Sequence, residues 1–261
     1  MKRLTLYVDK WYIIGAVCTD GIPHLICPSN KEDRFWLYFY EDVINDEVVY
    51  GKENQSHYRN NEPHYYGDVF SLITDKTNSF VRYGRKQDIH QIFKASGIIQ
   101  KIKDAVDEST NEKIETYLSF SCDISDGARL IFIRDVLTPD NFDIKESVAR
   151  IGHLALEHSL RNGRLSNEGF YIVLNACNEN LNYSIYVYKD GLFLRKNEAT
   201  LNGMGTDLRS RALLENVVYA INKTQHFLHT ESDFENEYLR LSQHVDDWII
   251  RLENAKPGRP I

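Results

Sequence analysis

Hydrophobic and polar positions near the start of the chain alternate with a period of two. Residues 4 to 50 hold four short runs of this kind, LTLYVD, YIIGAVC, HLICPS and RFWLYFY. Such runs are typical of strands. Asp20-Gly21 lies between the second and third runs and favours a tight hairpin turn. The segment therefore predicts an antiparallel meander.

A helical period follows. Apolar positions at 89, 92, 93, 99, 102 and 106 fall on one face of a single helix. YLSFSC, at 117 to 122, predicts a buried strand, and residues 126–137 and 146–160 predict the two helices after it. This order indicates α/β packing. The helices at 89–106 and 146–160 are expected to pack on the first lobe.

The strand pattern starts again at Phe170 and continues through LFLRKNEAT, after which residues 207–221 and 231–252 predict helices. The last helix carries an apolar stripe that includes Leu241, Val245 and Trp248. The chain thus runs meander, α/β, meander, which indicates a weak internal duplication. We expect lobe I at residues 1–165 and an incomplete lobe II at 166–261.

Composition narrows the functional classes. A chain of 261 residues with 42% hydrophobic content can bury a sizeable core. Its net charge of −7 and its lack of a long Lys/Arg run argue against nucleic acid as a partner. The four cysteines form no C-x-x-C pair, so no metal site is predicted.

The chain also carries no clear membrane or export signal. No apolar run approaches the roughly 20 residues of a membrane span. The apolar stretch near the N-terminus is short and interrupted by Asp9 and Lys10, so it is interpreted as a strand and not as a signal peptide. A cytoplasmic location is the expectation. The three tryptophans are expected in the core.

One polar interruption is unusual for a hairpin. In VLNACNENLNYSIYVY, at 173 to 188, two strand patterns are separated by residues 175 to 180, which hold three asparagines and no glycine. Asn tolerates a left-handed backbone better than most residues. We expect these asparagines to hold the turn.

Several segments together resemble one family. YVDKWYIIGAVCTDGIPHLICPSN is similar to an Asp-bearing strand and hairpin, YLSFSCDISDGAR to a strand and helix, and KESVARIGHLALEHSL to a segment with a catalytic glutamate. These segments resemble the actin-like ATPase superfamily, and in particular the nucleotide-binding domain of DnaK-type, seventy-kilodalton heat-shock chaperones. The resemblance implies an α/β, RNase H-like, two-lobed fold in which antiparallel meanders extend mixed sheets. It places Glu146 on the catalytic glutamate.

Residues 175 to 185 align without a gap with that family's second phosphate loop, D-L-G-G-G-T-F-D-V-S-I. Asn175 replaces the first Asp, Asn180 replaces Thr, and the three glycines are replaced by Cys177, Asn178 and Glu179. Side chains here would occupy the space of a phosphate, and Glu179 would repel it. LNGMGTDL resembles the later L-G-G-D-D-F-D and retains Gly203.

The first phosphate loop also departs from the family pattern. It reads Asp9-Lys10-Trp11-Tyr12 and is two residues shorter than the family's. GDVFSLI lacks the lysine that the family places in the corresponding segment. Of the family's catalytic set only Asp9 and Glu146 keep their identity. Glu146 also fits an ordinary first-turn helix carboxylate, and Asp9 and Asn175 also fit strand-end groups that satisfy the backbone.

Two functional hypotheses follow. The first is a degenerate DnaK-like domain, without a cofactor, that serves as a protein-binding or scaffold module in which Asp9 and Glu146 are vestigial. The second is an active ATPase or phosphotransferase that uses Asp9 and Glu146 to hold magnesium through water and that binds ATP. An uncovered edge of the second lobe invites pairing. We therefore expect either further chain beyond residue 261 or a second copy, as a homodimer, at that edge.

Overall fold

The computed structural model describes most of the chain. The described residues are 3–20, 22–29, 32–45, 47–59, 62–73, 79–82, 85–106, 113–146, 151–165, 168–225, 240, 241, 244, 245 and 248. The fold is α/β with mixed sheets and antiparallel meanders, as the sequence predicted. Contacts divide the chain into two units, Met1–Asn175 with Tyr183–Ala199, and Ala176–Asn182 with Thr200–Ile261. The lobe boundary at residue 165 stays a prediction.

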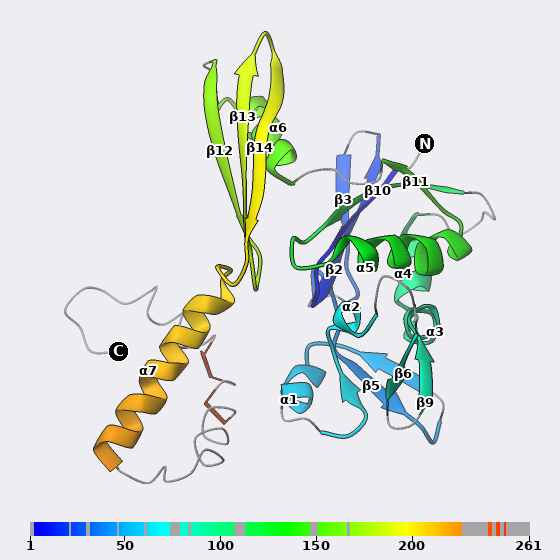
Figure 1. Ribbon diagram of the computed structural model, residues 1–261. Coiled ribbons are helices and arrows are strands. Elements are labelled where there is room, and N and C mark those ends of the chain that lie inside the picture. Colours follow the sequence, from blue (N-terminus) through cyan, green and yellow to red (C-terminus); the bar gives the residue numbers. More distant parts are fainter. Residues whose placement is uncertain are drawn as a thin grey trace. The chain divides into compact units, whose positions relative to one another are not determined.

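The largest sheet has the strand order β11-β10-β1-β2-β3, with β4 pairing with β2 (Figure 1). Strand β1 is parallel to β10, which is parallel to β11, whereas β2 is antiparallel to both β1 and β3. The predicted turn at Asp20 joins β2 to β3 with a φ of 52°. The strands of this sheet are β1 (Arg3–Val8), β2 (Tyr12–Thr19), β3 (Ile22–Ile26), β4 (Phe35–Trp36), β10 (Ile114–Phe120) and β11 (Phe142–Glu146).

The core of this sheet lies under its two central strands. Leu4, Leu6 and Val8 of β1 are fully buried, as is Leu118 of β10. Helices bring further apolar side chains into the same cluster, and Phe132 makes ring contacts with Phe70, Phe93 and Phe120. These helices are α2 (Val69–Leu72), α3 (Ile89–Ala95), α4 (Ile98–Val106), α5 (Asp126–Ile131), its π-helical continuation η1 (Phe132–Leu137) and the 3₁₀ turn η2 (Thr138–Asp140).

The single helix predicted over residues 89–106 is wrong. The chain forms α3 and α4 instead, separated by Ser96 and Gly97. Gly97 has a φ of 73°, a left-handed conformation that a helix interior does not contain. The amide of Gly97 donates to Lys94, which closes the end of α3. Both helices nevertheless bury their apolar residues in the same core cluster, so the apolar period gave no sign of the break.

The run RFWLYFY does not continue the meander as one strand. Its first part is β4, and its second part is β5 (Phe39–Asp42), which belongs to a separate sheet of order β6-β5-β7. The polar segment that follows contributes an aromatic side chain to the core, because Tyr66 is fully buried and stacks on Phe39. The other elements here are β6 (Glu47–Tyr50), α1 (Asn54–Arg59), β7 (Tyr65–Tyr66) and the hairpin β8 (Ser79–Arg82) and β9 (Arg85–Asp88).

The second meander is present as predicted. Strands β12 (Gly169–Ala176), β13 (Leu181–Lys189) and β14 (Leu192–Leu201) form a three-stranded sheet in sequence order, and short turns join them (Figure 1). Strands joined by such short turns run antiparallel. The turn between β13 and β14 places Asp190 and Gly191 at positive φ, as a two-residue hairpin requires.

Helix α6 (Ile151–Arg161) differs from its prediction in both start and packing. Glu146 ends strand β11, so the helix expected from Glu146 begins five residues later. Leu156 packs with Tyr186 and Phe193 of the second meander, which form a cluster apart from the core of the large sheet. The expectation that this helix packs on the first-lobe sheet is wrong.

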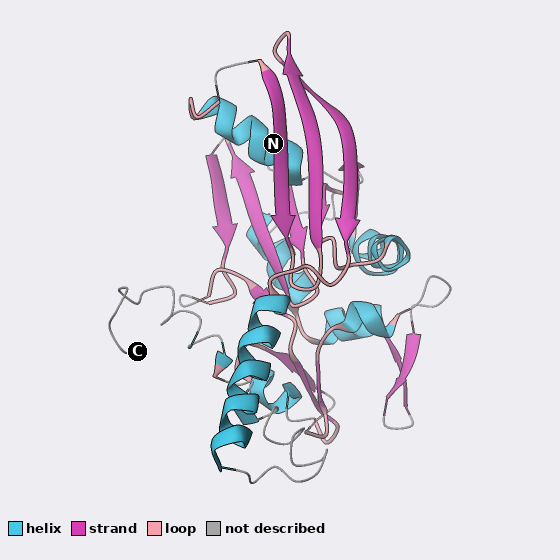
Figure 2. Cartoon of the chain, turned by 60° about the vertical axis from the view of Figure 1, so that its left-hand side comes forward, coloured by secondary structure: helices cyan, strands magenta, loops and turns pink. Residues whose placement is uncertain are grey.

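Helix α7 (Asp207–Gln225) is the long helix that follows the second meander (Figure 1 and Figure 2). Its buried Leu214 and Val218 pack with Leu241 and Val245. Trp248 packs at the edge of this cluster, half-buried. These contacts involve the apolar stripe predicted for residues 231–252, most of which lies outside the described residues.

Replacing Phe132 tests the core. Phe132→Ala removes a fully buried ring that contacts three others, so the free energy of unfolding should fall by about 3–5 kcal/mol in urea titrations. Leu130→Ala, two residues away and 67% exposed, is the control and should change it by less than about 0.5 kcal/mol. Equal effects of the two substitutions would contradict this packing.

Candidate functional site

The first loop begins where the central strand of the large sheet ends. The amide of Asp9 donates to the carbonyl of Tyr12 at 2.8 Å, and the amide of Trp11 donates to Oδ1 of Asp9 at 3.1 Å. Because β1 and β10 are parallel, their carboxyl ends meet at one sheet edge, where the amide of Ser121 donates to the carbonyl of Val8. The loop is therefore a tight connection held by its own aspartate.

Asp9 is almost completely buried, with 2% of its surface exposed. Burial raises the pKa of Asp9 above its ordinary value of 3.8. Hydrogen bonds from the Trp11 amide, the Ser121 side chain and Tyr7 oppose this rise in pKa, whereas the nearby carboxylate of Asp123 adds to it. Two carboxylates thus interact at the ends of neighbouring parallel strands, the edge at which ligands of open α/β sheets bind.

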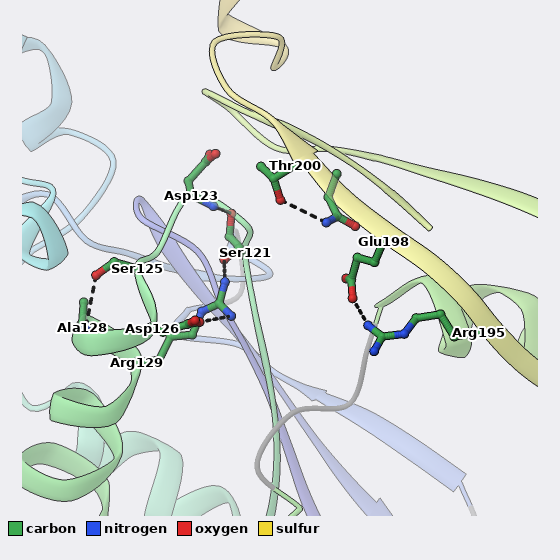
Figure 3. A network of polar contacts seen from close by, with 10 residues as sticks. Ser121, Asp123, Ser125, Asp126, Ala128, Arg129, Arg195, Glu198 and Thr200 are labelled. Carbon is green, nitrogen blue, oxygen red and sulfur yellow. Dashed lines mark hydrogen bonds and ion pairs between the residues drawn. The ribbon is translucent and has the colours of Figure 1, made fainter. Parts of the chain in front are cut away.

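An arginine fixes the strand end next to Asp9. The guanidinium of Arg129 donates to the carbonyl of Ser121 at 3.0 Å and pairs with Asp126 at 3.1 Å (Figure 3). Ser125 starts α5 by accepting a hydrogen bond from the amide of Ala128. Ser125, Asp126 and Arg129 therefore have structural roles at this strand end.

Lys10 forms an ion pair with Asp68. Its Nζ lies 2.9 Å from Oδ2 of Asp68, and the two side chains are 6% and 15% exposed. Asp68 has a left-handed backbone, with a φ of 48°, and caps α2 by accepting from the amide of Ser71. The cation of the first loop is thus neutralised by a carboxylate of the GDVFSLI segment.

The side chain of Trp11 packs within an aromatic cluster. Its ring stacks on Tyr38, with centroids 5.5 Å apart and an interplanar angle of 16°, and it lies 5.9 Å from Tyr58. Gly67 allows this stacking, because a Cβ there would lie 3.1 Å from Tyr38 and 3.3 Å from Trp11. The ring is half-buried, so the expectation that Trp11 is an ordinary core residue is only partly met.

Two cations cover the other end of this cluster. The guanidinium carbon of Arg34 lies 4.9 Å from the ring centroid of Tyr12 and 5.4 Å from that of Trp36. Nζ of Lys52 lies 5.5 Å from the centroid of Trp36, which itself stacks on Tyr38. We call Trp11, Tyr12, Trp36, Tyr38 and Tyr58 the aromatic cluster. It is a partly exposed surface of tryptophan, tyrosine and basic side chains.

The second loop, residues 177 to 180, closes on itself. The amide of Cys177 donates to the carbonyl of Asn180 at 2.9 Å. No residue from 175 to 180 has a positive φ, although all six are described. The asparagines are therefore not needed for a left-handed backbone, and that part of the expectation is wrong. The turn lacks glycine because its backbone does not require it.

The segment at 203 to 206 fills the space beside this loop. The amide of Gly203 donates to Oδ1 of Asn180 at 3.1 Å, and the amide of Gly205 donates to the carbonyl of Glu179 at 2.9 Å. A Cβ on Gly205 would lie 2.4 to 2.5 Å from backbone atoms of Asn178, Glu179 and Asn180, so only glycine fits. The backbone approach that a phosphate loop offers to an anion is here made to another segment of the chain.

The structure groups the predicted residues in two sets. Asp9, Lys10 and Trp11 form the first loop, whereas Asn178, Glu179 and Asn180 lie against residues 203 to 205. Asn175 is a strand residue of β12, and Glu146 ends β11, with its side chain outside what the structure describes. The two loops belong to different units.

Sequence reasoning missed Asp68, Gly205 and the pair formed by Ser121 and Asp123. For Gly205 a signal existed in the two glycines of GMGT. For Asp68 the only signal was a charge at the position of an expected lysine.

No family model matches this chain, and no curated protein matches it either. Among the described residues, no helix combines the length and apolar character that crossing a membrane requires.

A pH series tests the burial of Asp9. With a raised pKa in the folded state, Asp9 binds a proton more tightly in the native than in the unfolded chain. Its contribution to stability is complete below pH 3.8, its ordinary pKa, and is lost as the pH rises through the folded-state pKa. Asn resembles the protonated carboxyl. Urea unfolding should thus show Asp9→Asn gaining stability relative to the unmodified protein as the pH rises from about 4 to about 7.5.

Asp33→Asn is the matched control. A hydrogen bond from Arg34 lowers the pKa of this exposed carboxyl, so the unmodified protein should hold an advantage above pH 3.8 that is lost as the pH falls through the folded-state value. An Asp9→Asn variant with a stability difference that does not change with pH would contradict the burial of an ionisable Asp9.

A double-mutant cycle tests the pair of Lys10 and Asp68. Breaking a buried pair leaves one charge uncompensated, so Lys10→Met and Asp68→Asn should each lower the free energy of unfolding by about 3 kcal/mol. Together they should cost less than the sum by about 1 kcal/mol or more. Asp143→Asn, which breaks the exposed pair with Lys145, should have a far smaller effect on the free energy of unfolding. Strictly additive effects of Lys10→Met and Asp68→Asn on the free energy of unfolding would count against the ion pair.

Proposed function

We propose that this chain is a degenerate DnaK-like domain that does not work as an ATPase and serves as a protein-binding or scaffold module. The observation that carries the proposal is the state of the first loop. Its lysine is paired with Asp68, its tryptophan is stacked on Tyr38, and its aspartate is buried and hydrogen-bonded. A triphosphate needs a positive or donor-rich cradle, and here the charges and side chains are engaged with one another.

An actin-like fold is the architectural part of this proposal. The order β3-β2-β1-β10-β11 supports it, because two antiparallel hairpin strands extend a parallel set, as the resemblance implies for lobe I. The later meander of β12, β13 and β14 supports an incomplete second lobe in the same way. Asp9 would then stand at the position of the first phosphate loop, and residues 177 to 180 at the second.

The charge arrangement argues for loss of nucleotide binding. GDVFSLI lacks the lysine that the family has there and contains Asp68 instead, whereas this chain has a lysine, Lys10, in the first loop. The positive charge is thereby held within the protein. In the second loop, Glu179 adds a negative charge, and Gly205 packs against the loop backbone. Hydrogen bonds to a charged acceptor contribute roughly 1.5–3 kcal/mol each, so losing several weakens binding by orders of magnitude.

The aromatic cluster favours a protein as the partner. Tryptophan, tyrosine and arginine are enriched at protein interfaces and dominate their binding energy. Trp36 and Tyr12 are partly exposed and lie under Arg34, so this surface has the composition of such a site. We place the module in the cytoplasm, with no nucleic acid, membrane or cofactor among its ligands.

The second candidate is an active ATPase or phosphotransferase with magnesium. Asp9 favours it, because a carboxylate at the carboxyl end of a parallel strand, beside Asp123, offers the oxygen ligands that magnesium prefers. In that case Asp9 and Glu146 would hold the ion through water, and ATP would be the substrate.

Thermal unfolding with nucleotide separates the two. We expect millimolar Mg-ATP or Mg-ADP to leave the unfolding midpoint unchanged. A ligand at about 100 times its dissociation constant stabilises the native state by roughly 2.7 kcal/mol, which would raise the midpoint by several degrees. Asp9→Ala is measured with and without nucleotide as the control. A rise in the unmodified protein that disappears in Asp9→Ala would reject the scaffold proposal and favour the ATPase.

A further inference from the structure

The chain contains two Asn-Gly pairs, Asn162-Gly163 and Asn202-Gly203, and all four residues are exposed. In such a pair the amide nitrogen of the glycine can attack Cγ of the asparagine, because glycine has no Cβ to hinder the approach. The attack closes a small ring within the chain, so the reacting atoms need no encounter in solution. Both pairs thus hold the atoms of a deamidation reaction, and their surroundings decide its rate.

The pair Asn162-Gly163 closes the end of helix α6. The amide of Gly163 donates to the carbonyl of Leu160 at 3.0 Å, and the amide of Arg164 donates to that of Ser159 at 2.8 Å. With Gly163 at a φ of 66°, these bonds form the Schellman motif that ends many helices. Helix ends fray, so the Gly163 amide is released from Leu160 more readily than an amide inside the helix. No atom lies within 4 Å of the place that a Cβ of Gly163 would occupy.

An imidazole contacts the leaving group of this reaction. Nε2 of His158, four residues earlier on α6, lies 2.9 Å from Nδ2 of Asn162. Ring closure turns Nδ2 into an amine, and this amine departs as ammonia only after it gains a proton. Imidazole exchanges protons near neutral pH, and a general acid must lie within hydrogen-bond reach of the group that it protonates. His158 has this geometry.

The second pair has different surroundings. Gly203 also has a positive φ, 71°, but its amide donates to Oδ1 of Asn180 at 3.1 Å. Asn180 belongs to the loop to which the amides of Gly205 and Thr206 donate hydrogen bonds. Among the described residues, no imidazole forms a hydrogen bond with Asn202. The attacking amide is therefore held within a closed segment, and the leaving group lacks a proton donor of this kind.

We propose that Asn162 is a site of spontaneous deamidation in which His158 acts as the general acid. The nitrogen of Gly163 loses its proton to solvent and forms a bond to Cγ of Asn162. The bond between Cγ and Nδ2 then breaks, Nδ2 takes a proton from Nε2 of His158 and departs as ammonia, and a cyclic imide remains. His158 regains its proton from solvent. Water opens the imide at either carbonyl and gives aspartate or isoaspartate, so water is the only other reactant. This inference is independent of the proposed function.

The product would change the end of α6 that lies on the second meander. Leu160 and Leu165, on either side of Asn162, pack against the cluster of that meander. Isoaspartate adds one carbon to the backbone between these two leucines. Either product also adds a negative charge at the C-terminal end of a helix, where the helix dipole disfavours it. The modified protein should therefore unfold at a lower temperature than the unmodified protein.

Incubation of the full chain at neutral pH, followed by digestion and mass spectrometry, measures the conversion at each asparagine. Asn162 should convert faster than Asn202, which serves as the internal control because it has the same glycine neighbour and is also exposed. Both aspartate and isoaspartate should form at residue 162, since only the imide route gives isoaspartate. In water labelled with heavy oxygen, the label should enter the products.

His158→Gln tests the proton donor. The rate at Asn162 should fall by about tenfold, less than the roughly hundredfold of a rigidly held general acid, because both side chains are exposed. A looser helix end would raise the rate, so a slower reaction indicates chemical assistance and not a structural role of His158. His24→Gln, which removes an exposed histidine of β3, is the matched control and should leave the rate unchanged.

Three results would overturn the proposal. One is an Asn162 that keeps its amide or reacts no faster than Asn202, which would show that its surroundings add nothing to the Asn-Gly pair. The second is a rate at Asn162 that His158→Gln leaves unchanged or raises. The third is aspartate without isoaspartate at residue 162, which would indicate direct hydrolysis of the side chain.

Discussion

The parallel pairing of β1 with β10 is the constraint on which the large sheet depends. It joins residues 4 to 8 with residues 116 to 120, more than a hundred positions away, and buries the apolar side of β1 completely. Every other strand of this sheet is placed through these two. The hairpin strands β2 and β3 extend one side, and β11 extends the other. Because the loops at the carboxyl ends of β1 and β10 emerge together, the same pairing brings Asp9 beside Ser121 and Asp123.

Burial at this strand end then determines the electrostatics. Asp9 is removed from water and therefore needs donors, which the Trp11 amide and Ser121 provide. Lys10 is also buried, and Asp68 compensates its charge. A buried charge without a partner is strongly destabilising, so each group is committed to a neighbour. A loop whose charged groups are engaged within the protein in this way has little electrostatic attraction left for an anion.

The two meanders share one strand pattern but pack in different ways. In the first, β1 lies inside a larger sheet, and its inner side is covered by helices that bring Phe93 and Phe132 into the core. In the second, helix α6 covers one face, and among the described residues Phe170, Ile172 and Leu174 of the other face are exposed. The alternation of Phe170, Ile172 and Leu174 with Tyr171 and Val173 makes both faces of β12 apolar, which fits a strand with a partner on each side.

The sequence by itself determined the local elements. Period-two runs identified the strands of both meanders, and the period of 3.6 identified α5 and α7, because side-chain direction within one element depends only on neighbours in the chain. Asp20-Gly21 marked a hairpin turn, because only a few residue types accept the backbone angles of such a turn. The backbone break at Gly97 leaves the apolar period intact, so the sequence pattern could not reveal it.

Only the tertiary structure decided which elements pair and what the polar residues do. Helix α6 packs on the second meander and not on the large sheet, a choice that its apolar period alone does not determine. Asp68 pairs with Lys10, and Gly205 lies next to Glu179. The sequence pattern could not predict these contacts, because each joins segments that are distant along the chain. The spacing of 175 to 180 suggested a turn held by left-handed asparagines, yet the turn is closed by a backbone hydrogen bond and by packing on residues 203 to 206. A sequence pattern records which side chains are available, whereas the folded chain decides which of them meet.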